Sequence, residues 1–96
     1  MNLRQSLAAA IKAIRKSRGL TQEDFAVVSS RTYLSSLERG LKSPTIDKID
    51  EISKVLKIHP AAVVLMAYAM QAEPADRAAL IRKISEEAID ASPSLP

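Results

Sequence analysis

LTQEDFAVVSSRTYLSSLERG, residues 20–40, decides how this chain folds, because it contains two short helical patterns with barely a turn between them. Thr21 and Asp24 have the spacing of a capping box, which predicts that the first helix starts there. Ser29 and Ser30 disfavour a helix interior and favour helix ends, so they predict a break before the second helix. The stretch therefore predicts two short helices joined by a tight turn.

The second helix is expected from Arg31 to Arg39, because Gly40 ends it. Leu34 and Leu37 lie three residues apart and are predicted to face the core. The opposite face is short and polar, and consists of Thr32, Ser35, Ser36 and Arg39. Serine and threonine cost a few tenths of a kcal/mol each inside a helix, yet short hydroxyls let a helix lie deep in the major groove of DNA. This face favours contact with bases; a plain helical hairpin is the structural alternative.

The rest of the chain is also predicted to be helical. A first helix carries an apolar stripe from Leu3 to Ile14 and ends at Gly19. A fourth starts at the cap Thr45, a fifth at Pro60, and a sixth spans 75–91. In the two short helices between residues 20 and 40, Phe25 and Ala26 are expected on the core side. The fold class is therefore all-α, with residues 1–72 as one domain, 73–91 as an added C-terminal helix and 92–96 as a disordered tail.

The fifth predicted helix is apolar on nearly all sides from Ala61 to Met70. A domain this small cannot bury such a helix all round, so a second subunit is expected to cover part of it. Completion of the monomer's own core is the alternative, and the dimer interface is favoured. The predicted interface residues are Val64, Leu65, Tyr68, Leu80, Ile81 and Ile84.

Charge is distributed unevenly along the 96 residues, whose formal net charge is +3. Residues 1–44 contain eight basic and three acidic side chains, whereas residues 45–96 contain six basic and eight acidic ones. The basic half includes the two short helices, which favours binding of a polyanion by the N-terminal half of the chain. The absence of cysteine excludes disulfides. The longest uncharged run, 58–72, is shorter than the roughly 20 residues of a membrane span, so a cytoplasmic protein without a membrane partner is expected.

Catalytic and metal sites are not expected. His59 is the only histidine and precedes Pro60, which suits a helix cap better than a metal ligand. The acidic cluster of Asp47, Asp50 and Glu51 is explained by a solvated helix face with Lys54 as a partner. No serine comes with a recognisable base and orienting group, and there is no glycine-rich phosphate loop. We therefore expect neither enzymatic activity nor a cofactor.

Several ordered segments carry a family resemblance. They are Ile11-Lys-Ala-Ile-Arg15, Gly19-Leu-Thr-Gln-Glu-Asp-Phe-Ala26, Tyr33-Leu-Ser-Ser-Leu-Glu-Arg-Gly40, Ser43-Pro-Thr-Ile46 and Ile52-Ser-Lys-Val-Leu-Lys-Ile58. Together they resemble the Cro/C1-type (XRE-like) helix-turn-helix domain of phage repressors and bacterial transcriptional regulators. The resemblance covers about residues 7–65 and implies a five-helix, lambda-repressor-like domain.

The resemblance also implies roles for individual residues. It makes Arg31–Arg39 the recognition helix, with Arg31, Thr32, Ser35 and Ser36 at base-reading positions. Gln22, Tyr33, Arg39, Lys42 and Ser43 match positions that contact the DNA backbone. Arg15 and Glu38 match a structural salt bridge between the first helix and the recognition helix.

The chain departs from the family pattern at the turn. Six residues separate Ala26 from Tyr33, where the family has about eight, including a glycine. The first of the two short helices must therefore be shorter, or the turn tighter, and the start of the recognition helix can shift.

These features predict a DNA-binding transcriptional regulator that acts as a homodimer on a pseudo-palindromic operator, and a repressor is favoured over an activator. The alternative is an antitoxin or adaptor whose main role is to bind a protein partner through its apolar C-terminal helices.

Overall fold

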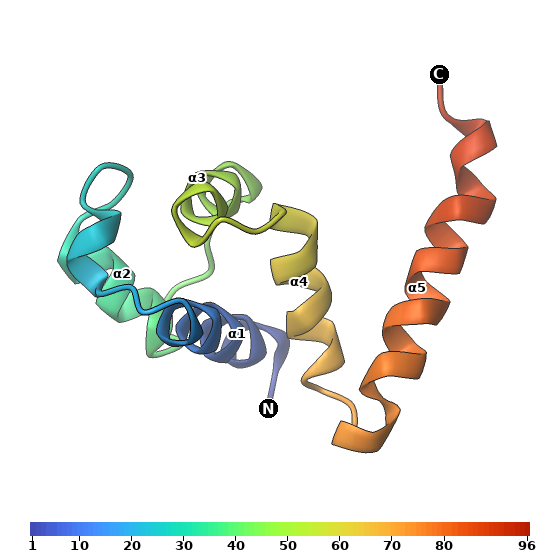
Figure 1. The fold of residues 1–96 in the computed structure, drawn as a ribbon, viewed down its shortest axis with the longest axis horizontal. Helices are drawn as coiled ribbons and strands as arrows, with labels where there is room; N and C mark the ends of the chain where they lie inside the picture. Colours follow the sequence, from blue (N-terminus) through green and yellow to red (C-terminus); the bar gives the residue numbers. More distant parts are fainter.

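The computed structural model describes all residues from 1 to 96 and is entirely helical (Figure 1). Its helices are α1 (Leu3–Ser17), α2 (Arg31–Glu38), α3 (Ile46–Leu56), α4 (Pro60–Ala69) and α5 (Arg77–Ala91). Three short 3-10 segments accompany them: η1 (Gln22–Phe25), η2 (Pro74–Asp76) and η3 (Ser92–Ser94). The all-α fold class is confirmed.

The first of the two short helices is a single 3-10 turn, η1, and not an α-helix. Beyond Phe25 the chain continues only as a turn, in which the N–H groups of Val28 and Ser29 both donate to the carbonyl of Phe25. Phe25 is fully buried, as expected, but Ala26 is exposed, so the prediction for Ala26 is wrong. Because η1 is only one turn long, it presents one residue, Phe25, to the core, and Ala26 lies beyond its end.

Side chains cap the helices where the sequence predicted. Ser30 accepts a hydrogen bond from the backbone N–H of Tyr33 at the start of α2, and Thr45 accepts one from Lys48 at the start of α3. His59 caps α4, because its Nδ1 accepts from the N–H of Ala61 at 3.0 Å. These caps fix where each helix begins.

Three helices end in the same hydrogen-bond pattern, in which the chain passes through a left-handed residue. Gly19 and Gly40 occupy this position after α1 and α2, with φ of 68° and 75°. Lys57 occupies it after α3 with φ of 58°, although a side chain disfavours that conformation.

The hydrophobic core lies between α1, α2, α3, α4 and η1. Its fully buried side chains are Ile11, Phe25, Leu34, Leu37, Ile52, Leu56 and Val63. Leu34 and Leu37 anchor α2 by its inner face, as predicted, and thereby turn its other face outward. The core therefore holds the short polar helix at the surface.

Helix α5 stands away from this core and packs only beside α4 (Figure 1). None of its residues is buried. Ser92–Ser94, in the range predicted to be a disordered tail, form η3, which continues from α5. No single helix is long and apolar enough to cross a membrane; α3 and α4 satisfy that criterion only as a pair, and the chain bends by 101° between them.

Candidate nucleic-acid interface

A polar groove lies where η1 meets the outward face of α2. It is lined by Gln22, Arg31, Thr32, Ser35 and Arg39, and no hydrophobic side chain contributes to it. Three of these residues were predicted to contact bases, and the other two were predicted to contact the DNA backbone. The structure thus brings together five of the predicted residues on one face of the two short segments.

Ser36 does not share this face. The sequence predicted an exposed hydroxyl, but Ser36 is only 8% exposed and does not line the polar groove. Ser36 follows Ser35 by about 100° around the helix and lies next to the buried Leu37. Its position on the inner edge of α2 explains the difference.

Arg31 is the first residue of α2 and forms an ion pair with Glu23 of η1, with Nη1 of Arg31 3.2 Å from Oε1 of Glu23. Both side chains are more than 70% exposed, so the pair is weak and the guanidinium remains accessible. Helix α2 starts at Arg31, as the sequence predicted, in spite of the shortened turn.

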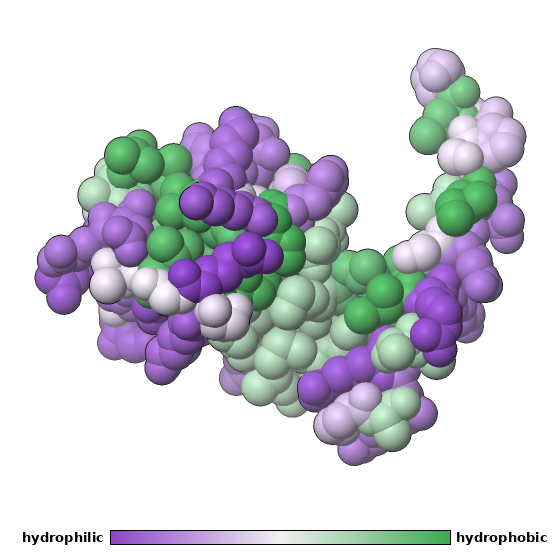
Figure 2. All heavy atoms as spheres, in the orientation of Figure 1, coloured by the Kyte–Doolittle hydropathy of each residue, from purple (hydrophilic) through white to green (hydrophobic).

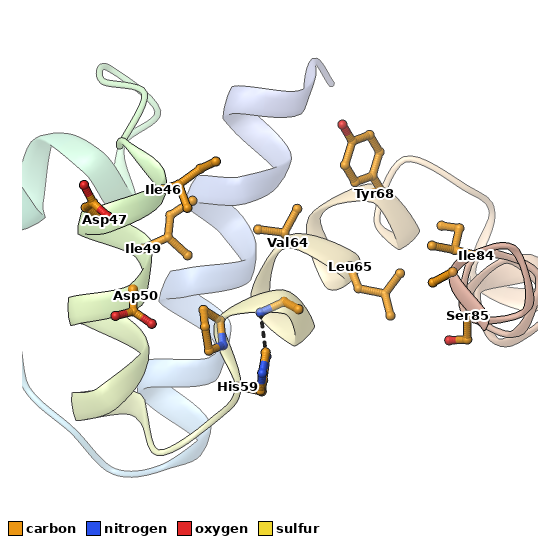
Figure 3. Close-up of a pocket in the computed structure, with 13 residues that line it drawn as sticks. Ile46, Asp47, Ile49, Asp50, His59, Val64, Leu65, Tyr68, Ile84 and Ser85 are labelled. Atoms are coloured by element: carbon orange, nitrogen blue, oxygen red, sulfur yellow. Dashed lines mark hydrogen bonds between the residues drawn. The ribbon is translucent and has the colours of Figure 1, made fainter. Parts of the chain in front are cut away.

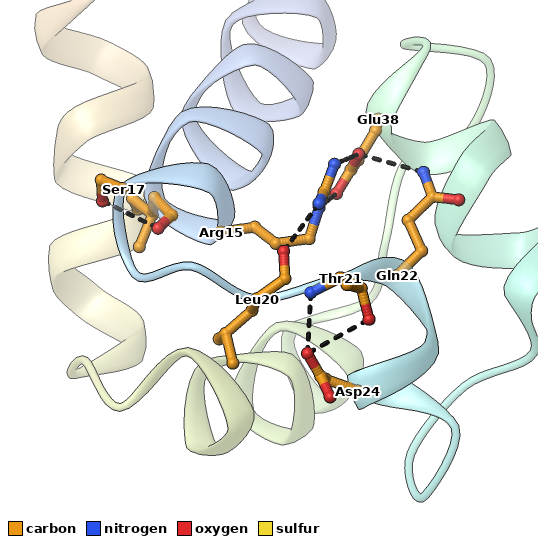
Figure 4. A network of polar contacts seen from close by, with 8 residues as sticks. Arg15, Ser17, Leu20, Thr21, Gln22, Asp24 and Glu38 are labelled. Carbon is orange, nitrogen blue, oxygen red and sulfur yellow. Dashed lines mark hydrogen bonds and ion pairs between the residues drawn. The ribbon is translucent and has the colours of Figure 1, made fainter.

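A buried ion pair fixes the end of α2 against α1 (Figure 4). The guanidinium of Arg15 donates two hydrogen bonds to the carboxylate of Glu38, at 2.6 and 2.9 Å, and a third to the carbonyl of Leu20. Gln22 donates to the same carboxylate at 3.2 Å, which ties η1 to the pair. The family resemblance implied the Arg15–Glu38 pair, and the structure contains it. The hydrogen bonds to Glu38 raise the pKa of Arg15 above its ordinary value. Burial of the guanidinium lowers this pKa, and the negative charge of Glu38 raises it further.

The residues predicted to contact the DNA backbone lie around the polar groove and beyond the end of α2. Arg39, Lys42 and Ser43 are exposed, and Tyr33 is half-buried against the core. The ammonium groups of Lys42 and Lys48 lie 5.9 and 5.7 Å from the centre of the Tyr33 ring. The contact of Lys48 with Tyr33 was not predicted from the sequence. The one unusual feature of Lys48 in the sequence is that it is a cation three residues after the cap Thr45, where the start of a helix favours acidic side chains.

A second, apolar groove of about 760 Å³ separates α5 from α3 and α4 (Figure 3). Figure 2 shows hydrophobic residues at its base, where α5 meets the body of the molecule. Four of the six predicted interface residues line it: Val64, Leu65, Tyr68 and Ile84. Leu80 and Ile81 are partly exposed on α5 but do not line the groove. Ile46 at the groove edge is 85% exposed.

Comparison with known proteins places this arrangement in context. A family model described as helix-turn-helix matches residues 11–63, more than half of the chain. The uncharacterized HTH-type transcriptional regulator y4dJ of Sinorhizobium fredii is 37% identical over 60 residues, which are 60% of this chain and 78% of that protein. The immunity repressor protein of Bacillus phage phi105 is 39% identical over 56 residues, covering 56% of this chain and 39% of the repressor.

Among solved structures, the clp gene regulator ClgR from C. glutamicum is similar in fold. It superimposes with a TM-score of 0.69 and 31% sequence identity, over 75% of this chain and 96% of the ClgR chain. The matched family region contains η1, α2 and the whole polar groove.

Proposed function

Because this chain belongs to the Cro/C1-type helix-turn-helix family of DNA-binding transcriptional regulators, we propose that it binds one DNA sequence as a two-fold dimer. The observation that carries this proposal is the polar groove of Gln22, Arg31, Thr32, Ser35 and Arg39 on the outward face of α2. The family is a class of DNA-binding regulators and not of enzymes.

Base reading is assigned to the first turns of α2. Arg31 can donate two hydrogen bonds to the major-groove edge of guanine, and the hydroxyls of Thr32 and Ser35 can meet either purines or pyrimidines. Releasing Arg31 from Glu23 costs little, because both side chains are solvent-exposed. Ser36 is left out of this set, because it lies on the inner edge of the helix.

Contacts with the DNA backbone are assigned to Gln22, Tyr33, Arg39, Lys42 and Ser43. They lie beside the polar groove or just beyond the end of α2, where a helix seated in the major groove meets the flanking phosphates. Such contacts set the orientation of α2 and make binding salt-dependent, and they do not select a sequence.

A second copy of the chain is the proposed occupant of the apolar surface of α4 and α5. Helix α5 has no buried residue, and the groove beside it exposes Val64, Leu65 and Ile84 to solvent in the monomer. Leu80 and Ile81 extend this apolar surface along α5. A two-fold pairing here would leave both α2 helices free on the opposite side of the molecule. To read two half-sites on one face of the DNA, the pairing must set them about 34 Å apart, one turn of DNA.

Repression is the proposed sign of regulation, supported by the similarity to a phage immunity repressor. A bound dimer would act by occupying its operator, and its concentration would set the occupancy.

Selection from a pool of random duplexes at two salt concentrations tests the proposed function. A dimer that reads sequence should enrich a short palindrome, with half-sites about 10 base pairs apart, and should keep that preference at the higher salt. Uniform retention that disappears with salt would overturn the proposal, since basic surface chemistry alone would then explain binding.

The dimer surface can be tested with two matched substitutions on α5. Ala88 lines the apolar groove, whereas Ala79 is exposed and does not. Ala88→Asp should convert the dimer to a monomer in sedimentation analysis and weaken operator binding, and Ala79→Asp should do neither. If the unaltered chain forms no discrete dimer and aggregates through this surface, the adaptor alternative becomes the better explanation.

A further inference from the structure

The turn between η1 and α2 is held by a lysine from a different helix. The ammonium of Lys48, the third residue of α3, donates to the carbonyl of Val28 at 2.8 Å across 20 residues of sequence. No backbone N–H donates to this carbonyl. The half-buried carbonyl at the end of the shortened turn therefore obtains its partner from the Lys48 side chain.

The same ammonium has two other neighbours. Its distance to the carboxylate of Glu51 is 3.1 Å, and it lies 5.7 Å from the centre of the Tyr33 ring on α2. An ammonium has three N–H donors. Val28 and Glu51 accept two of its three N–H groups, the ring face lies beside it, and its side chain is only 28% exposed. These contacts place Lys48 to hold other groups of the protein.

The position of Lys48 in its own helix supports a role outside that helix. The first turn of a helix favours acidic side chains and disfavours cations, because unpaired N–H groups point toward it. The residue three positions after a Thr cap is commonly Glu or Gln, which completes a capping box. Lysine at this position weakens the start of α3, and the contacts to Val28 and Tyr33 offset that loss.

We infer that Lys48 is a positioning residue that sets the orientation of the recognition helix α2 on DNA by joining α3 to the turn and to the Tyr33 ring. This inference rests on the proposed function and deepens it. Apart from core packing, α2 is fixed at its C-terminal end by the Arg15–Glu38 pair. Lys48 fixes the N-terminal part, where Arg31 and Thr32 would read bases, without touching the DNA.

The test compares two substitutions that each remove one lysine from α3. Lys48→Met keeps the aliphatic stem and removes the charge and the donors. Lys54→Met is the control, because Lys54 is 75% exposed and pairs only with Asp50 at 3.6 Å. Affinity for the enriched palindrome and for a scrambled duplex is measured over a range of salt concentrations. Amide hydrogen exchange of the free proteins is measured in parallel.

Lys48→Met should lower the ratio of specific to nonspecific affinity by about tenfold, with the salt slope unchanged apart from the small effect seen in Lys54→Met. The amides of Val28 and Ser29 should exchange about tenfold faster in Lys48→Met, whereas those in the core of α1 should not change. Lys48→Arg keeps a cation with donors and should recover part of the lost ratio.

Equal weakening on all sequences with a reduced salt slope would overturn the inference and make Lys48 a phosphate contact. Behaviour identical to Lys54→Met, or a Lys48→Arg protein as defective as Lys48→Met, would also overturn it. If the unaltered chain shows no sequence preference, the proposed function itself fails. The exchange of the Val28 and Ser29 amides then still decides whether Lys48 holds the turn.

Discussion

Arg15 on α1 and Glu38 at the last turn of α2 form a buried ion pair with Nε and Oε2 2.6 Å apart, and their side chains are 10% and 3% exposed. The planar guanidinium matches the carboxylate with two parallel hydrogen bonds, which fixes direction as well as distance. Gln22 of η1 joins the same carboxylate. One carboxylate therefore links α1 to η1 and α2, the two segments that line the polar groove.

Removal of Arg15 should be strongly destabilising. Arg15→Met leaves Glu38 buried with only Gln22 as a partner, and the expected loss in the free energy of unfolding is about 3 kcal/mol or more. Urea denaturation followed by circular dichroism measures it. The double variant Arg15→Met/Glu38→Leu removes both charges and should lose less than Arg15→Met alone. The single variant Glu38→Leu completes the comparison. If the double variant loses as much free energy of unfolding as Arg15→Met and Glu38→Leu together, the two residues are not coupled.

Adjacent serines of α2 should behave differently. Ser35→Ala removes a hydroxyl from the polar groove and should relax the preference at one base pair by about 1 kcal/mol. Ser36→Ala, at a position only 8% exposed, should leave the enriched sequence unchanged. Repeating the duplex selection with each variant makes the comparison, and an altered site for Ser36→Ala would return that residue to the base-reading set.

Lys42 should contribute affinity without sequence preference. It is exposed in the loop after α2, with its ammonium 5.9 Å from the centre of the Tyr33 ring. Lys42→Ala should weaken binding to specific and scrambled duplexes alike and lower the salt slope by about 0.9 for each bound subunit. Fluorescence anisotropy over a salt series measures both quantities. A change confined to the specific duplex would contradict the assignment of Lys42 to the backbone.

Lys57 should be replaceable by glycine with a gain in stability. Its φ of 58° is left-handed, and glycine adopts that conformation without a side-chain penalty. Lys57→Gly should raise the free energy of unfolding by up to about 1 kcal/mol. Lys54→Gly, in the exposed interior of the same helix, should lower it by about 1 kcal/mol. Equal signs for the two substitutions in thermal denaturation would show that the conformation of Lys57 is not strained.

Local signals were sufficient to predict the helices and their ends. Ser30, Thr45 and His59 cap helices as the sequence indicated, and Gly40 ends α2. Leu34 and Leu37 were placed correctly because two apolar residues three apart define one side of a short helix. The partner of Arg15 was expected only from family resemblance, since spacing alone does not pair residues 23 positions apart.

The errors come from packing that local patterns do not encode. Ser36 lies at the border between the two faces of α2, where a rotation of a few tens of degrees decides whether a small side chain is exposed. Ala26 was misplaced because η1 is only one turn long. Lys48 was missed because its partner, the Val28 carbonyl, is created by a turn whose shape depends on tertiary contacts.

A titration of the isotope-labelled chain with its enriched duplex shows whether the face formed by η1 and α2 binds DNA. Backbone and side-chain resonances are followed by two-dimensional NMR. The largest shifts are expected at Gln22, Arg31, Thr32, Ser35 and Arg39, which line the polar groove. Shifts concentrated instead along α4 and α5, with the polar groove unaffected, would show that η1 and α2 do not form the DNA-binding face.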